Sequence, residues 1–212
     1  MSYDVFPIFS SVVGTTKVKH DLTDFKKILQ NLDYHSTESE GSYNSYVSKD
    51  MFLLDSYMDV KDILLQEFNS FKNAVLRLET TQFDITTSWA TKTLKEGYCQ
   101  FHNHKNSFYS AVLYFEKSQH GSLTFNDVGI NNSSFEVNEP IEYNIFNYRT
   151  FNVWPDNNLI VFFPSNMYHK INPHLDSFDR YSIAFNLIPV GEIGQGDSRM
   201  KIQKMTNRKN LK

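Results

Sequence analysis

Two histidines separated by one residue, His102 and His104, are the side chains in this sequence best suited to bind a metal. Residues two apart on a β-strand project from the same face, so both imidazoles could reach one ion. A third histidine, His169, follows the apolar run 159–163 and a short turn. First-row metals accept neutral imidazole, and three protein ligands leave coordination positions open on the ion. The sequence therefore predicts an open metal site.

These histidines also have a simpler interpretation. An isolated histidine is more often exposed or hydrogen-bonded than bound to a metal, and a His-x-His pair also arises by chance. The pair alone leaves both interpretations open. The other histidines lie in polar loops or beside predicted helices and are assigned no role: His20, His35, His120 and His174.

Arg180 opens a strand-like run in which polar and apolar residues alternate. This alternation places Arg180 and Ser182 on one face, opposite Tyr181. A guanidinium that points inward needs a partner, and a small dicarboxylate would supply one through a bidentate, charge-assisted bond to which Ser182 could also donate. The alternative is an exposed arginine paired with a nearby acid, Asp176 or Asp179.

The elements that must position these side chains fall into a helical part and a β-rich part. Apolar spacing predicts amphipathic helices over 22–32 and 60–78, with a polar surface loop at 35–44 between them. From residue 83 onward, runs rich in Tyr, Phe, Val, Ile and Thr alternate with clusters of Gly, Asn, Asp and Pro, which is typical of strands joined by turns. We expect strands at 85–90, 98–103, 109–115, 122–125, 142–151, 158–163 and 180–187.

This arrangement predicts a mainly β fold with N-terminal helices, either an antiparallel sandwich or a jelly roll. We expect a single domain over 1–190, with helical support at 20–80 and a β core at 83–190. The remainder, 191–212, is expected to be a basic, solvated tail. A basic arm that contacts a partner is the alternative.

Composition excludes several classes of protein. The chain has 212 residues, of which 40% are hydrophobic and 15% aromatic, enough for one packed core. A net charge of -3 and a pI near 6.2 argue against binding nucleic acid through a broad cationic surface. The single cysteine, Cys99, excludes an internal disulfide and favours a reducing compartment, the cytoplasm by default. No segment is apolar over the ~18 residues that a membrane span needs, so no membrane association is expected. A homo-oligomer stays open.

Further motifs accompany the histidines and the arginine. In chain order they are Ser88-Trp89, Gly97, SAVLYF at 110–115, GSLTFND at 121–127, Phe163-Pro164-Ser165 and RYSIAFN at 180–186. Together with His102, His104 and His169, they resemble a family of 2-oxoglutarate- and Fe(II)-dependent oxygenases from marine bacteria and their phages. The pattern is also distantly similar to the prolyl hydroxylases. The resemblance covers most of the chain, with its core from Ser88 to Asn186.

The resemblance implies a cupin-like jelly roll, the double-stranded β-helix, with Fe(II) held by a His-x-acid pair and a distal histidine. By position, His102 is the first ligand, His169 is the distal ligand and Arg180 binds the far carboxylate of 2-oxoglutarate. His104 stands where the superfamily usually has an acid, which leaves either an all-histidine site or recruitment of Asp127. We favour His104, because the resembling family itself carries His-x-His. The metal centre would then be more positive.

Tyr114 matches a tyrosine that helps to bind the co-substrate in related hydroxylases, so its phenol is expected to donate to 2-oxoglutarate; a core aromatic is the alternative. The implied reaction consumes 2-oxoglutarate and oxygen and hydroxylates a protein side chain or a small molecule. Segments 35–48 and 129–140 are expected to shape the substrate end. Two other functions stay open: a non-catalytic jelly roll that binds or supports a partner, and a three-histidine cupin-like metalloenzyme that does not use 2-oxoglutarate.

Overall fold

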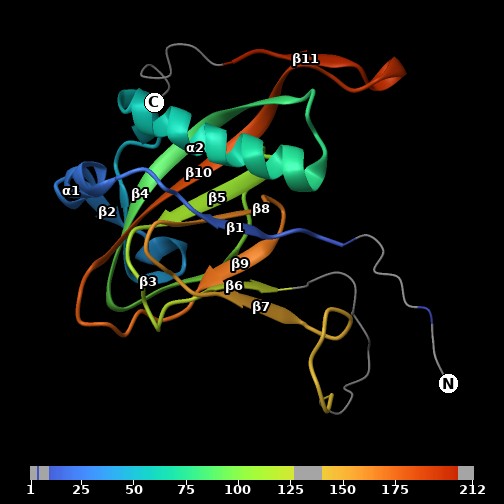
Figure 1. Cartoon of the computed structure of the whole chain (residues 1–212). Coiled ribbons are helices and arrows are strands. Elements are labelled where there is room, and N and C mark those ends of the chain that lie inside the picture. The colour runs from blue at the N-terminus through green and yellow to red at the C-terminus, as the bar shows by residue number, and fades with distance from the viewer. Residues whose placement is uncertain (1–3, 5–9, 127–139, 205–212) are drawn as a thin grey trace.

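A computed structural model describes residues 4, 10–126 and 140–204 (Figure 1). Its helical elements are α1 (Thr23–Gln30), η1 (Glu38–Glu40), η2 (Leu53–Ser56), α2 (Met58–Phe71), η3 (Lys72–Leu76) and η4 (Gly196–Ser198). Its strands are β1 (Gly14–Lys17), β2 (Tyr34–Ser36), β3 (Ser42–Ser48), β4 (Gln82–His102), β5 (Tyr109–Tyr114), β6 (Leu123–Asn126), β7 (Thr150–Val153), β8 (Leu159–Pro164), β9 (Tyr168–Ile171), β10 (Arg180–Ile193) and β11 (Met200–Ile202). Within the described ranges, no helix is long and apolar enough to cross a membrane.

The strands form a curled antiparallel sheet in the order β1-β8-β5-β10-β4-β9-β6-β7, with β3 also paired to β4. We call β1, β8, β5, β10, β3 and the first part of β4 the large layer, and β9, β6 and β7 the small layer. Figure 1 shows α2 lying across one side of the large layer and the small layer on the other. The large layer is therefore covered on both faces.

Side-chain alternation along the central strands divides the interior into two apolar clusters. On β5, Ala111 and Leu113 pack in the cluster that contains the helix residues Phe25 and Phe68. The intervening Val112 and Tyr114 belong to a second cluster, which includes residues of β6, β7 and β8. Successive residues of a strand point to opposite faces, so a strand buried on both sides is apolar throughout. The site described below lies on the face that carries the second cluster.

β4 is a single strand that takes part in both layers. Residues 82–93 pair with β10, whereas Cys99 and His102 pair with β9. Between these parts the register against β3 shifts by several residues, opposite Asn44. Gly97 lies in this bulge, and a Cβ there would stand 2.5 Å from the carbonyl oxygen of Asn44 and 2.7 Å from that of Leu94. The close approach of the backbones requires glycine at this position.

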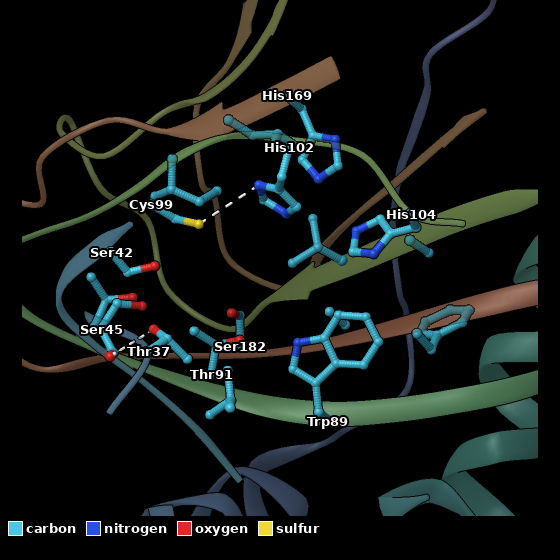
Figure 2. Close-up of a pocket in the computed structure, with 18 of the residues that line it drawn as sticks. Thr37, Ser42, Ser45, Trp89, Thr91, Cys99, His102, His104, His169 and Ser182 are labelled. Carbon is cyan, nitrogen blue, oxygen red and sulfur yellow. Dashed lines mark hydrogen bonds between the residues drawn. The ribbon is translucent and has the colours of Figure 1, made fainter. Parts of the chain in front are cut away.

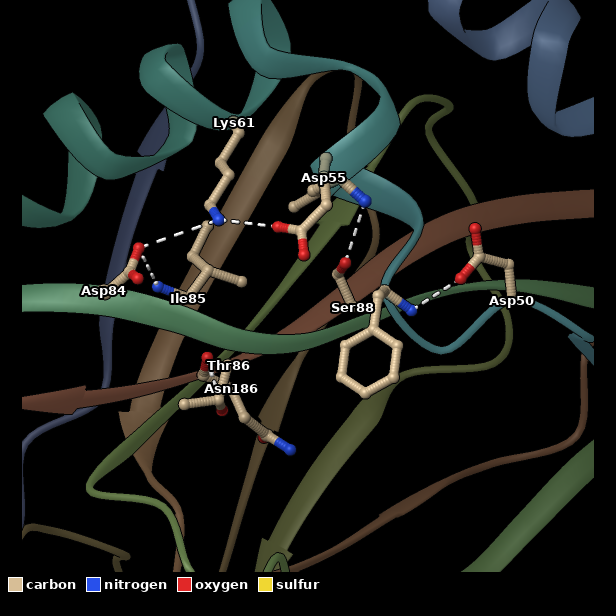
Figure 3. Close-up of polar contacts among 10 residues, drawn as sticks. Asp50, Asp55, Lys61, Asp84, Ile85, Thr86, Ser88 and Asn186 are labelled. Atoms are coloured by element: carbon tan, nitrogen blue, oxygen red, sulfur yellow. Dashed lines mark hydrogen bonds and ion pairs between the residues drawn. The ribbon is translucent and has the colours of Figure 1, made fainter. Parts of the chain in front are cut away.

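A buried ion-pair cluster fastens α2 to β4 (Figure 3). The ammonium of Lys61 lies 2.7 Å from a carboxylate oxygen of Asp55 and 3.7 Å from one of Asp84. The side chains of Lys61 and Asp84 are 8% and 7% exposed. Burying these charges costs free energy unless they are paired, so the cluster fixes the position of α2 on the sheet.

The Lys61→Ala variant should test that role. It removes the cation that faces two carboxylates, and we expect the free energy of unfolding to fall by about 3 kcal/mol. The matched control is Lys27→Ala, which removes an exposed ion pair to Asp24 and should cost less than about 0.5 kcal/mol. Equal losses in a urea titration of the two variants would contradict the assignment.

The predicted mainly β fold with N-terminal helices is confirmed, but several element assignments were wrong. The two strands expected at 85–90 and 98–103 are parts of the continuous β4. The segment 35–44, expected to be a surface loop, contains most of β2, η1 and the start of β3, because β3 pairs with the edge of β4 and β2 pairs with β3. The strand expected at 142–151 is replaced by the shorter β7, and β9 and β11 were not predicted. β11 lies within the expected tail and pairs with β10.

Candidate metal and 2-oxoglutarate site

The three histidines singled out by the sequence lie together at one end of the small layer (Figure 2). His102 is the last residue of β4 and pairs directly with His169 of β9. His104 follows β4 and is not part of it, so the expectation that one strand carries both His102 and His104 was wrong. Its backbone N–H donates to the carbonyl oxygen of Ser165, at 2.9 Å, which turns it back toward the other two rings.

The geometry of the cluster suits a single ion. One ring nitrogen from each histidine lies within 4.8 Å of the others. Nδ1 of His102 is 2.9 Å from the carbonyl oxygen of Gln100, and Nδ1 of His169 is 2.9 Å from that of Met167. A carbonyl only accepts, so Nδ1 carries the proton in both rings and Nε2 has the lone pair that a metal needs. By accepting hydrogen bonds from Nδ1, these carbonyl groups fix the orientation of the two imidazole rings.

Electrostatics keep most of the cluster neutral. Burial, helped by the proximity of His102, lowers the pKa of His104 to about 4, and burial lowers that of His169 to about 3. Burial also acts to lower the pKa of His102, but the hydrogen bond and attraction to Cys99 outweigh it, so this pKa lies above its ordinary value. Uncharged imidazole is the form that binds first-row metals. The donor set therefore fits Fe(II).

Arg180 is buried on the same side of the sheet, with 2% of its surface exposed. One of its nitrogens, Nη1, donates to the carbonyl oxygen of Gly121 at 2.8 Å, and Cζ lies 5.6 Å from the centre of the Tyr114 ring. Burial lowers the pKa of Arg180, but guanidinium stays charged. No carboxylate among the described residues forms an ion pair with it.

The alternative of an exposed Arg180 paired with Asp176 or Asp179 was wrong. Asp179 pairs with Lys92 at 3.2 Å, and Asp176 accepts a hydrogen bond from Ser118. The predicted alternation is observed: Tyr181 packs in the cluster beneath the helices, whereas Arg180 and Ser182 line the cavity. The guanidinium therefore faces the cavity with most of its donors available to an anion.

Tyr114 points a polar atom into the same region. Its side chain is 1% exposed, and its hydroxyl has no hydrogen-bond partner in the part of the chain that the structure describes. Burial raises the pKa of this phenol, so it stays protonated and can donate. An orphaned buried hydroxyl beside a buried cation is costly unless a ligand satisfies it. A carboxylate could accept hydrogen bonds from both the Tyr114 hydroxyl and the Arg180 guanidinium.

All these side chains border one cavity of about 600 Å³. Its walls combine the histidines, Arg180, Ser182 and Tyr114 with apolar residues of both layers and with residues of the segment 35–47. The lining residues that had been given no role include Trp89, whose ring centre is 5.5 Å from that of His104, and Cys99 and Thr91. The alternation in β4 could have identified Trp89 and Thr91. Asp127, the alternative ligand, lies outside the described residues.

Comparisons with known proteins agree with this chemistry. Residues 87–186 match the family described as "Putative 2OG-Fe(II) oxygenase". Among curated proteins, no sequence match was found.

Three solved structures illustrate the likeness of the fold. A 2OG-Fe(II) oxygenase family oxidoreductase from Burkholderia pseudomallei has a TM-score of 0.59 and 11% identity, over 82% of this chain and 83% of that one. HygX from Streptomyces hygroscopicus, with nickel and 2-oxoglutarate bound, has a TM-score of 0.58 and 12% identity, over 84% and 83%. A prolyl-4-hydroxylase from Pseudomonas putida has a TM-score of 0.52 and 15% identity, over 82% and 91%.

At these identities the structural likeness establishes the fold, and the predicted jelly roll is confirmed. The family match covers the part of the chain that carries the three histidines, Tyr114 and Arg180. It also confirms the expected cofactor and co-substrate, Fe(II) and 2-oxoglutarate. Residues 87–186 therefore match the family of 2OG-Fe(II) oxygenases.

Proposed function

We propose that this protein hydroxylates a carbon of its substrate, with His102, His104 and His169 as the iron ligands and Arg180 as the anchor for 2-oxoglutarate. The observation that carries the proposal is the shared cavity: three imidazoles, of which His104 and His169 are held neutral by burial, open into the same space as a buried guanidinium that has no carboxylate partner among the described residues. A ligand with a metal-binding end and a distant carboxylate matches both.

Bound Fe(II) would supply the oxidising chemistry: 2-oxoglutarate and oxygen are converted to succinate and carbon dioxide, while one oxygen atom enters a substrate C–H bond. The protein's own groups bind and orient. Arg180 neutralises the far carboxylate, and Tyr114 and Ser182 donate hydrogen bonds to it. Apolar walls, including Leu123 and Ile171, keep water away from the co-substrate.

The substrate is proposed to enter beside β2 and β3. The segment 35–47 contributes several residues to the cavity wall, among them His35, Thr37 and Glu40, which supports its expected role in shaping the substrate end. The proposed substrates remain a protein side chain, as for a prolyl hydroxylase, and a small molecule. Most of the second expected segment, 129–140, lies outside the described residues.

The proposal retains the cytoplasm as the place of action, since Cys99 is a free thiol at the cavity wall. The marine or phage origin, the homo-oligomer and the lack of nucleic-acid binding stay predictions from the sequence.

The assignment of Arg180 can be checked by anaerobic titration of the Fe(II)-loaded protein with 2-oxoglutarate, followed by the weak visible metal-to-ligand charge-transfer band. In Arg180→Ala, loss of a charge-assisted pair should weaken binding by about 2 kcal/mol, or roughly thirtyfold. Arg199→Ala removes an exposed arginine and should bind normally. No band in a folded, iron-replete sample would rule out the co-substrate site. A non-catalytic binding protein or a different three-histidine metalloenzyme would then remain.

The ligand assignment can be checked with Co(II), whose visible spectrum reports coordination directly. Replacing His102, His104 or His169 by alanine should each reduce Co(II) affinity by at least about a hundredfold, because every ligand contributes a bond. His20→Ala is the control, since His20 is an exposed histidine that does not line the cavity. Normal Co(II) affinity in His104→Ala would exclude His104 as a ligand and leave Asp127 as the alternative third ligand.

A further inference from the structure

The guanidinium of Arg180 is held between an aromatic ring and a stretch of backbone. Cζ lies 5.6 Å from the centre of the Tyr114 ring, and Nη1 donates to the carbonyl oxygen of Gly121 at 2.8 Å. This hydrogen bond is the one that the guanidinium makes within the described residues. Its remaining N–H groups are therefore available to a carboxylate, but only in the orientation that the Gly121 contact allows.

Gly121 provides more than a carbonyl oxygen. Its φ is +65°, a conformation that residues with a side chain seldom adopt. A Cβ built on Gly121 would overlap Nη1 of Arg180 and would also stand 3.1 Å from Cζ and 3.3 Å from Nη2. The guanidinium therefore packs against the Gly121 backbone in space that any other residue would fill.

The loop that carries Gly121 is fastened to the loop that precedes Arg180. Ser118 donates a hydrogen bond to the carboxylate of Asp176, and its backbone N–H donates to the carbonyl oxygen of Pro155 at 3.1 Å. On the other side of Gly121, the backbone N–H of Asn172 donates to the carbonyl oxygen of Ser122 at 3.0 Å. Gly121 is thus fixed relative to β9 and β10, the strands that carry His169 and Arg180.

We propose that Gly121 is a positioning residue for 2-oxoglutarate: its carbonyl oxygen and its missing side chain together set the orientation in which Arg180 meets the far carboxylate. This inference rests on the proposed function of Arg180. The side chain that Gly121 approaches is Arg180, which is not one of the proposed metal ligands, so Gly121 should act on co-substrate affinity and leave metal binding unchanged.

The experiment measures the dissociation constant of 2-oxoglutarate by calorimetry on the Ni(II)-loaded protein. Gly121→Ala should raise this constant roughly ten- to a hundredfold, because the guanidinium is displaced from its position. The matched control is Gly196→Ala. Gly196 also has a positive φ, +57°, but nothing lies within 4 Å of the point where a Cβ would stand, so only backbone strain is added. The dissociation constant of 2-oxoglutarate for Gly196→Ala should stay within about threefold of the wild-type value.

A second ligand separates positioning from general damage. 2-Oxopentanoate has the same keto-acid end and chain length as 2-oxoglutarate but no far carboxylate. Its affinity should be equal in wild type and Gly121→Ala. In an Arg180→Ala background, Gly121→Ala should produce no further loss of 2-oxoglutarate affinity, since the residue through which it acts is gone. Ni(II) affinity should be the same in all of these variants.

The outcomes distinguish the two claims. If Arg180→Ala binds 2-oxoglutarate normally, the proposed function fails. Suppose that Arg180→Ala weakens 2-oxoglutarate binding. If Gly121→Ala then behaves like Gly196→Ala, or weakens the binding of both ligands equally, the proposed role of Gly121 is overturned and the proposed function stands. Should Gly121→Ala not fold, Ser118→Ala carries the test. Release of the loop should then weaken the binding of 2-oxoglutarate at least about threefold without affecting the binding of 2-oxopentanoate. Equal effects on the two affinities would overturn the proposal.

Discussion

The bend in β4 is the constraint on which the rest of the structure depends. Before it, β4 forms the large layer with β10; after it, β4 pairs with β9 in the small layer. Glu96 has a φ of +67°, and the backbones of Glu96 and Gly97 exchange hydrogen bonds with that of His174, at 2.6 and 2.9 Å. Because of the bend, His102 at the end of β4 lies over residues in the first part of the same strand, such as Trp89. Without it, no cavity would lie between Trp89 and the histidines.

Charge balance in that cavity explains why a dianion suits it. Among the described residues that line the cavity, Glu40 is the one acid, and it is exposed. The proposed all-histidine set would add no negative charge to offset a divalent metal, and Arg180 adds a further positive charge nearby. A dicarboxylate co-substrate offsets much of this excess. The metal and the co-substrate should therefore depend on each other more strongly here than in a site that contains an acidic ligand.

Local pattern was a good guide wherever one strand determined the outcome. The period of two placed Arg180 and Ser182 on the face opposite Tyr181, and apolar spacing identified both major helices. It failed where pairing with a distant strand determined the structure. The polar segment after His35 forms strands because β3 pairs with the edge of β4 and β2 pairs with β3. β9, only four residues long, depends on β4 and β6 on either side. Polar composition indicates exposure in such segments but carries no information about a neighbouring strand.

The sequence by itself determined which kinds of groups are available to the site, because residue type and order do not depend on how the chain folds. Through its resemblance to a family it also predicted their roles. Only the tertiary structure decided that His104 lies beyond its strand and is held by Ser165, that Asp176 ties two loops together and leaves Arg180 unpaired among the described residues, and that Gly121 lies against the guanidinium. These outcomes depend on contacts between residues far apart in the chain, such as Gly121 and Arg180, 59 positions from each other. Such contacts follow from strand register and burial across the whole sheet, which no local pattern in the chain encodes.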